Sequence, residues 1–301
     1  ESLAQALSAA GEDGVGTRVV LLEDVTDCSR LPIAGKEVTV DLNGHDIGFA
    51  YNSYFRVQGG TLNLTGEGKV YEQSPYYSPV MMYGSSDSTA ENYSVVNVGS
   101  GVTLQGWAGL FMDPSSGNAN YGMVAAISGT LISVKDIDGG DGHALYVNGQ
   151  IANTEGAVPR ITQDGATLLS SGNGMYLAGY TETVIRNSTI TSDGEGGTGI
   201  EIRAGKLTIS NSSITGGSGE YEGAPNGNGS TSQNVALAVA QHTTELPLEV
   251  TVESGTLTGG AAFVQANPQG NGAEAVEKVQ IEILGGTFDG QVYSENKEGF
   301  I

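Results

Sequence analysis

The sequence predicts an all-β solenoid, in which short parallel strands stack coil upon coil along a rod. Stretches of alternating apolar residues recur from about residue 38 to the end of the 301-residue chain, at steps of 25 to 37 residues, and such a period is typical of solenoid repeats. The chain contains 47 glycines and only 8 prolines, a composition typical of many short strands joined by tight corners. The plainest coil is 250–265, VTVESGTLTGGAAFVQ.

The first expected element is a short helix. Within residues 1–11, Leu3, Leu7 and Ala10 lie at helical spacing, and Gly11 ends the pattern. We expect this helix to cover the open N-terminal end of the solenoid.

The rest of the chain is expected to complete a single domain that spans 1–301. Residues 18–25 (RVVLLEDV) are strand-like, and the repeats continue to about residue 293. We expect 18–293 to form about eight or nine coils, and strands about 4.8 Å apart would then build a rod on the order of 40 Å long. Residues 294–301 are expected to be a polar tail.

Each coil begins with a strand whose alternation buries one face. The members are VTVDL (38–42), TLNL (61–64), VVNV (95–98), TVIR (183–186), KLTI (206–209), LEVTV (248–252) and VQIEI (279–283). A corner of recurring chemistry follows, as in NSTI (187–190) and NSSI (211–214). The matching Asn187 and Asn211 predict stacked asparagines that hydrogen-bond the backbone of the next coil, in preference to a ligand role.

A later strand of each coil carries the more informative side chains. Its members are PVMMY (79–83), GLFMD (109–113), ALYVN (144–148), GMYLA (174–178), GIEIR (199–203), ALAVA (236–240) and AFVQA (262–266). Because equivalent positions of neighbouring coils stack, the outward residues should form two ladders on a solvent face. The first ladder is Arg56, Met81, Phe111, Tyr146, Tyr176 and Glu201, and the second is Gln58, Tyr83, Asp113, Asn148, Ala178 and Arg203.

These ladders are the candidate binding site. Aromatic ring faces can cover the apolar face of a sugar, while charged and amide groups bond its hydroxyls. The predicted ligand-binding residues are Arg56, Tyr83, Phe111, Asp113, Tyr146, Asn148, Tyr176, Glu201 and Arg203. The alternative is that an aromatic ladder only stabilises the sheet, as cross-strand pairs do elsewhere.

The charge of the chain restricts its partners. Twelve basic residues against 34 acidic ones give a net charge of -22, which repels phosphate backbones and anionic membrane surfaces. We therefore expect no nucleic-acid partner, and no run of residues is long and apolar enough to predict membrane insertion. The single cysteine, Cys28, excludes an internal disulfide and is expected to be a small buried residue.

The repeat resembles the right-handed, single-stranded parallel β-helix of the pectate-lyase-like superfamily, and in particular the repeat-rich surface proteins of gut bacteria in that group. The likeness rests on VTVDLNGHDIG (38–48), TLNLTGEGKV (61–70) and the late repeats VTVESGTLTGG and IEILGGTFDG. It implies an exported, cell-surface, adhesin-like protein whose partner is a glycan or a host surface protein. Other members of the superfamily are polysaccharide lyases and hydrolases, so the fold alone does not choose between these functions.

An acidic, glycine-rich stretch offers a candidate metal site. Asp136, Asp138 and Asp141 place three carboxylates close together in the sequence, and calcium prefers oxygen ligands of this kind. The stretch lacks the full spacing of a calcium loop, so a solvated acidic turn is the alternative. No other cofactor is expected.

No complete catalytic constellation is visible. Superfamily enzymes imply either a basic residue beside calcium-holding carboxylates or paired aspartates, and only Glu201, Arg203 and Asp113 could serve in this chain. The three histidines are far apart in the sequence, so neither a triad nor a zinc cluster is predicted. The sequence therefore favours a non-enzymatic binding module, with a polysaccharide lyase or glycosidase as the alternative and an inert spacer as a third reading.

Overall fold

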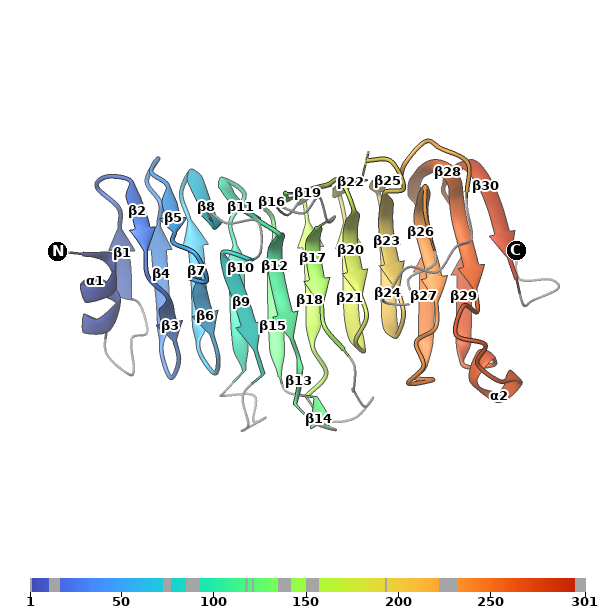
Figure 1. The fold of residues 1–301 in the computed structure, drawn as a ribbon, viewed down its shortest axis with the longest axis horizontal. Helices are drawn as coiled ribbons and strands as arrows, with labels where there is room; N and C mark the ends of the chain where they lie inside the picture. Colours follow the sequence, from blue (N-terminus) through green and yellow to red (C-terminus); the bar gives the residue numbers. More distant parts are fainter. Residues whose placement is uncertain are drawn as a thin grey trace.

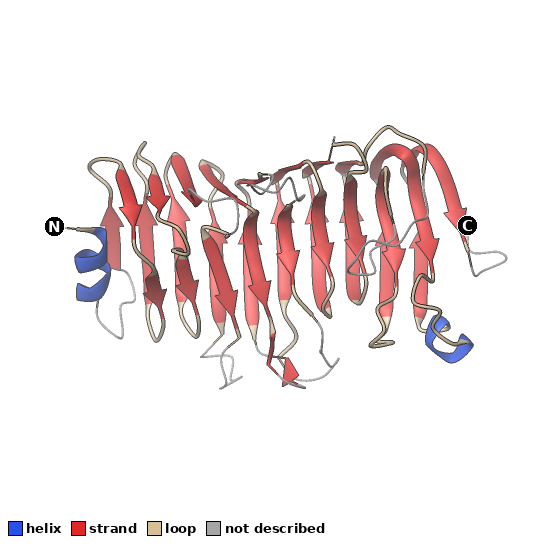
Figure 2. Cartoon of the chain, viewed as in Figure 1, coloured by secondary structure: helices blue, strands red, loops and turns tan. Residues whose placement is uncertain are grey.

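The chain forms an elongated stack of β-strands. The computed structural model describes residues 2–10, 17–72, 77–84, 93–116, 119–120, 122–134, 142–149, 157–192, 194–221 and 232–295. In this part of the chain the fold is all-β apart from two short helices, and the strands succeed one another along the long axis from the N-terminus to the C-terminus (Figures 1 and 2). The architecture is consistent with a parallel β-solenoid.

One side of the stack is a ten-stranded sheet in which every neighbouring pair is parallel. Its strands, in spatial order, are β1 (Thr17–Val20), β4 (Glu37–Asp41), β7 (Thr61–Thr65), β10 (Ser94–Val98), β15 (Met123–Ile127), β18 (Arg160–Asp164), β21 (Thr181–Arg186), β24 (Gly205–Ser210), β27 (Leu248–Val252) and β29 (Val279–Ile283). Spatial order follows chain order, so each coil stacks on the coil before it.

The other two sides consist of two parallel ladders. One contains β2 (Val25–Cys28), β5 (Ile47–Phe49), β8 (Gly68–Glu72), β11 (Val102–Gly106), β16 (Thr130–Ser133), β19 (Thr167–Ser170), β22 (Thr189–Ser192) and β25 (Ser212–Thr215). The other contains β3 (Leu31–Ile33), β6 (Phe55–Val57), β9 (Val80–Tyr83), β12 (Ala108–Asp113), β17 (His143–Val147), β20 (Asn173–Leu177), β23 (Thr198–Ile202) and β26 (Val235–Ala240).

Two long strands join these ladders into one 18-stranded sheet. They are β28 (Gly255–Ala266) and β30 (Thr287–Ser294), and each runs through both ladders without a break. A separate antiparallel pair, β13 (Ser115–Ser116) with β14 (Ala119–Asn120), projects from the edge of the stack (Figure 1).

Two strands of the ten-stranded sheet did not stand out in the sequence. In β15, Ala125 and Ala126 follow each other, so the contrast between inward and outward residues is weak. In β18, the inward position between Ile127 and Ile185 is occupied by Gln163. Small or polar residues at inward positions remove the alternation on which strand recognition depends.

The apolar core fills the space between the three sides. In the plainest coil, Val250, Leu257 and Phe263 come from different stretches of the coil and each has at most 1% of its surface exposed. They belong to one continuous cluster of buried side chains that extends back to Leu3. Apolar residues at matching positions of successive coils therefore form a single core along the rod.

Two helices lie near the ends of the stack (Figure 2). Helix α1 (Leu3–Ala9) begins with a capping box between Ser2 and Gln5, and its Leu3 and Leu7 are buried in the core cluster. Helix α2 (Ala273–Val276) is a single turn between β28 and β29. Neither of these helices, nor any other part of the described chain, has the length and apolarity to span a bilayer as a helix.

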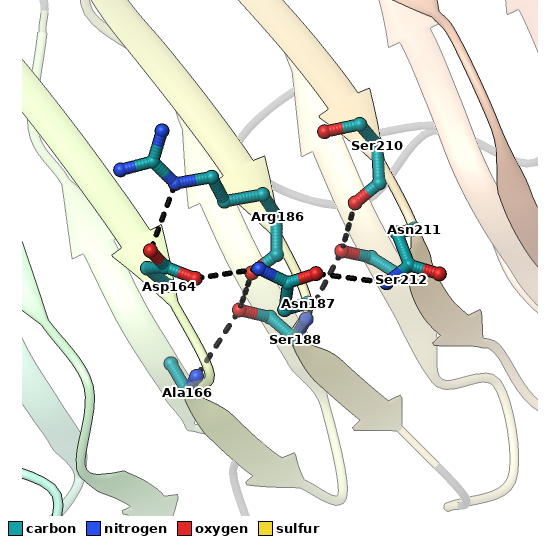
Figure 3. Close-up of polar contacts among 8 residues, drawn as sticks. All are labelled: Asp164, Ala166, Arg186, Asn187, Ser188, Ser210, Asn211 and Ser212. Carbon is teal, nitrogen blue, oxygen red and sulfur yellow. Dashed lines mark hydrogen bonds and ion pairs between the residues drawn. The ribbon is translucent and has the colours of Figure 1, made fainter.

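Hydrogen bonds between side chains connect the corners of neighbouring coils (Figure 3). The Asn211 amide Nδ2 donates to Asn187 Oδ1 over 2.8 Å, and Asn187 Nδ2 donates to Asp164 Oδ1 over 2.8 Å. The predicted stacking of the two asparagines is confirmed, but their bonds run from side chain to side chain. The backbone is bonded instead by Ser188 and Ser212, whose hydroxyls accept from main-chain N–H groups of the preceding coil.

The last coil is less covered than the coils before it. Leu284 is 63% exposed, and Val292 and Tyr293 are exposed as well. One coil earlier, the register partners Phe263 and Val264 are fully buried. Burial of each coil therefore depends on a neighbour on both sides.

Gln163 yields a prediction about stability. Its side chain has no exposed surface, its Nε2 donates only to the Met175 sulfur over 3.2 Å, and its buried Oε1 has no partner among the described residues. A buried acceptor without a partner costs about 1–3 kcal/mol. We expect Gln163→Met, which keeps the length of the side chain, to raise the free energy of unfolding by about 1 kcal/mol in urea titrations. Gln280→Met, on the exposed face of β29, should change it little, and a loss of stability in Gln163→Met would refute the explanation.

Candidate functional site

The outward rows predicted from the sequence are brought together by the strand register. Arg56 pairs with Met81, Met81 with Phe111, Phe111 with Tyr146, Tyr146 with Tyr176, and Tyr176 with Glu201. In the second row Asp113 pairs with Tyr83, and main-chain bonds from Asn148, Ala178 and Arg203 continue the row. We call this surface the ladder face: the outer surface of β6, β9, β12, β17, β20 and β23 and of the residue directly after each strand.

Only the N-terminal half of the ladder face is open to solvent. Arg56 is exposed, and Tyr83, Phe111, Asp113, Tyr146 and Asn148 are each partly exposed. In contrast, Tyr176 is 4% exposed, and Glu201 and Arg203 have no exposed surface. The expectation of a solvent face is therefore correct only as far as Tyr146 and Asn148.

A segment after β25 lies on the outer side of β26 and β28, just beyond the C-terminal end of the ladder face. Gly217 donates its N–H to Gly197 O and accepts from Gly260 N–H, both over 2.9 Å. Tyr221 packs on the cluster formed by Val235, Ala238, Ala261, Val264 and Ala266, which are the outward residues of β26 and β28. This packing gives the late coils a second, small apolar core outside the solenoid.

The aromatic residues of the ladder stack on one another. The ring centroids of Phe111 and Tyr146 are 5.1 Å apart, and those of Tyr146 and Tyr176 are 5.5 Å apart with planes only 6° from parallel. This spacing follows from the distance of about 4.8 Å between neighbouring strands. Because the ring faces contact each other, the ladder presents ring edges and hydroxyls to solvent rather than the ring faces expected of a sugar platform.

Trp107 and His143 extend the aromatic cluster, and the sequence reasoning missed both. The His143 ring lies 5.0 Å from Tyr146 and 5.4 Å from Tyr176, stacked on both, and Trp107 meets it edge to face at 5.2 Å. The inward residues Ala144 and Leu145 follow each other at this corner, which brings positions 143 and 146 to the same outer surface. A break in the alternation was the signal that could have located His143.

His143 makes stability depend on pH. Burial lowers its pKa to about 4, and its buried Nδ1 has no partner among the described residues, whereas histidine in an unfolded chain titrates near 6.5. Between about pH 6.5 and 4 the unfolded state therefore binds a proton that folded His143 does not, so the free energy of unfolding falls as the pH falls.

We expect urea midpoints to decrease from pH 7 to pH 4.5 and to decrease less in His143→Phe, which keeps a ring in the stack. When the free energy of unfolding from these titrations is plotted against pH, the slopes for wild type and variant should differ by at most about 1.4 kcal/mol per pH unit. Identical slopes for wild type and variant would show that His143 is protonated equally in both states.

The exposed half of the ladder face carries four polar side chains that we call the polar row, Arg56 from the first row and Tyr83, Asp113 and Asn148 from the second. The Arg56 guanidinium lies over the Tyr83 ring at 4.9 Å, and Asn148 Nδ2 donates to Asp113 Oδ1 over 3.4 Å. Burial is the largest cause that raises the pKa of Tyr83, and a hydrogen bond with Tyr54 is the next largest. Burial, and to a smaller extent the charge of Asp113, also raises the pKa of Tyr146. Both phenols therefore stay protonated at neutral pH and can donate hydrogen bonds.

The buried half holds the charged residues of the enzymatic alternative. Arg203 donates from Nε to Ala240 O over 3.2 Å and from Nη1 to the Tyr176 hydroxyl over 3.3 Å. The pKa of Tyr176 is raised to about 12, chiefly by burial and next by the negative charge of Glu201, whereas the positive charge of Arg203 lowers it. A polysaccharide has no path to Glu201 or Arg203 in this conformation, because neither has exposed surface.

The predicted metal ligands cannot be placed. Asp136, Asp138 and Asp141 lie outside the described residues. Within the described ranges, no three His, Cys, Asp or Glu side chains gather in a geometry that could hold a metal ion. Cys28 is buried, and burial raises the pKa of its thiol to about 11, so the thiol is not activated as a nucleophile.

Comparisons with known proteins do not add a family to these observations. No family model, no curated protein and no solved structure matches the chain.

Proposed function

We propose that this chain is a non-enzymatic, adhesin-like module that binds a glycan or a host surface partner along the exposed half of the ladder face. The observation that carries the proposal is the polar row Arg56, Tyr83, Asp113 and Asn148, which interrupts an otherwise regular repeat over four consecutive coils. In the late coils the corresponding positions carry aliphatic residues, Ala238 and Val264 in the first row and Ala240 and Ala266 in the second. Side chains that depart from the repeat without filling the core are the natural carriers of a binding function.

The proposal includes the finer features of the fold. We infer a single-stranded, right-handed parallel β-helix of the pectate-lyase-like type, with α1 as its N-terminal cap. The burial of Leu3 and Leu7 against the core supports the capping role. The resemblance in the sequence supports an extracellular or cell-surface location.

The chemistry of the row suits a polyhydroxylated ligand. Asp113 accepts hydrogen bonds, Asn148 both donates and accepts, and the hydroxyls of Tyr83 and Tyr146 donate while they remain protonated. Because the stacked rings offer edges to solvent, affinity would come chiefly from these polar groups and from shape. Sites of this kind bind one partner weakly and gain strength when several copies engage together.

Binding to a panel of oligosaccharides would test the proposal. We expect Asp113→Ala/Asn148→Ala to weaken glycan binding at least about tenfold, because each hydrogen bond to a charged or amide partner contributes about 1 kcal/mol or more. Thr208→Ala/Thr251→Ala is the matched control, because these two residues are register partners on the outer face of the ten-stranded sheet. Unchanged binding in the Asp113/Asn148 variant would remove the site assignment, and no binding of any glycan or host surface protein by the wild type would favour an inert spacer.

A further inference from the structure

Most cations on the ten-stranded sheet are matched with a carboxylate. Arg160 pairs with Glu182 at 3.4 Å, Arg186 with Asp164 at 2.9 Å, and Lys206 with Glu249 at 3.2 Å. Arg18 is paired with Asp41 in the same way. With 34 acidic residues and only 12 basic ones in the chain, carboxylates are numerous enough to match each of these four cations.

Away from this sheet, several described cations form no ion pair with another described residue. Lys69 lies over the Tyr71 ring, and Lys36 and Lys278 donate to main-chain oxygens.

Arg30 and Arg56 are two neighbouring arginines of this kind. Within the described residues neither guanidinium forms an ion pair, although both side chains are exposed. Each is instead held over a tyrosine ring, Arg30 over Tyr54 at 4.6 Å and Arg56 over Tyr83 at 4.9 Å. Cation–π contacts position a guanidinium without neutralising its charge.

The two arginine–tyrosine pairs are neighbours at the N-terminal end of the ladder face. Arg30 and Tyr54 directly precede Leu31 and Phe55, which are register partners in β3 and β6. Arg56 lies two residues beyond Tyr54 and is therefore one coil along from Arg30. Tyr54 and Tyr83 are also linked, because a hydrogen bond between them contributes to the raised pKa of Tyr83.

Stacking leaves the hydrogen-bonding edge of a guanidinium available. The ring contact occupies the flat face, whereas the five N–H donors lie in the plane and match the oxygens of a carboxylate or a sulfate. Arg30 already donates from Nη2 to the main-chain and side-chain oxygens of Asn52, at 3.2 and 3.1 Å. Arg56 makes no hydrogen bond with any described residue, so its whole donor edge is available.

We propose that Arg30 and Arg56, held over Tyr54 and Tyr83, form an oxyanion subsite that takes the carboxylate or sulfate group of an acidic glycan. The inference rests on the proposed function and names its ligand class. It also orients the ligand, with the acidic group at the N-terminal end of the ladder face and the neutral hydroxyls over Asp113 and Asn148. Two cations on neighbouring coils, without an ion pair in the described chain, give this place an attraction for anions in a chain of net charge -22.

The test compares matched oligosaccharides by calorimetric titration of the 301-residue chain. A glucuronate-containing oligosaccharide is compared with its carboxyl-reduced form, and a sulfated galactan oligosaccharide with its desulfated form. We expect the anionic member of at least one pair to bind about tenfold more tightly, because charge-assisted bonds are about twice as strong as neutral ones. Arg56→Gln should abolish this preference, whereas Arg160→Gln, which removes the same charge from a 59% exposed side chain on another face, should leave it intact.

A second readout separates this inference from the proposed function. The Nε–H signals of the arginines are followed by NMR during addition of free glucuronate or inorganic sulfate, with glucose as the neutral control. Shifts confined to Arg30 and Arg56 would support the subsite even if no oligosaccharide binds, in which case the proposed glycan function fails alone. Equal binding of neutral and anionic oligosaccharides would leave the function standing and overturn the subsite, and so would the absence of any shift at Arg56.

Discussion

Replacing Arg203 with methionine is expected to lower the free energy of unfolding by about 3–5 kcal/mol, because the substitution removes one of two charges buried close together. Glu201 lies in β23, and Arg203 is the first residue after that strand. Both side chains are on the same outer surface, and neither is exposed to solvent. Methionine fills a similar volume but cannot donate to the Ala240 carbonyl or to the Tyr176 hydroxyl. The Glu201 carboxylate would then stay buried without this cation.

The cost should depend on Glu201. We expect Glu201→Gln/Arg203→Met to be more stable than Arg203→Met alone, since the double variant leaves no buried charge behind at this position. Lys206→Met is the control, because Lys206 is an exposed cation paired with Glu249 and should cost at most about 1 kcal/mol. Denaturant titrations followed by circular dichroism would measure all three, and equal losses for Arg203→Met and Lys206→Met would contradict the burial argument.

The second large effect is expected at Asn187. Its backbone has a left-handed φ of 53°, and its amide both donates to Asp164 and accepts from Asn211. We expect Asn187→Ala to lower the free energy of unfolding by about 3 kcal/mol, with about 1 kcal/mol from backbone strain and about 1 kcal/mol from each lost hydrogen bond.

Glycine at the same position separates the two contributions. Gly165 occupies the matching corner one coil earlier with a φ of 71°, so Asn187→Gly keeps a backbone that the repeat already tolerates. We expect it to be about 1 kcal/mol more stable than Asn187→Ala in the same titrations. Equal stabilities would show that the amide ladder, and not the left-handed corner, explains why asparagine occurs there.

Much of the frame could be predicted from alternation alone. The register that stacks Phe111, Tyr146, Tyr176 and Glu201 follows from matching short apolar patterns, because a strand slipped by one residue would turn its core residues outward. The pairing of Asn187 with Asn211 was predictable for the same reason. Strands with weak contrast, such as β15, were not.

The environment of the ladder face was not predictable in the same way. Periodicity states which side chains point outward, but it does not state that Tyr176, Glu201 and Arg203 are closed off from solvent. The glycine-rich stretch around Gly217 follows the late coils through main-chain bonds, which any sequence with suitable backbone freedom could make. Ring stacking likewise depends on the distance between coils, and His143 joined the cluster through a local break in alternation.

The strictly sequential pairing of the strands has a consequence for how the molecule opens. In the described part of the chain, each strand of the ten-stranded sheet bonds only to those of the coils directly before and after it, so no strand pairing ties the first coils to the last. Local opening in such a chain spreads from coil to coil rather than through the whole molecule at once. Amide hydrogens of β29 and β30 should therefore exchange with solvent first, and the central coils that carry Tyr83, Asp113 and Asn148 last.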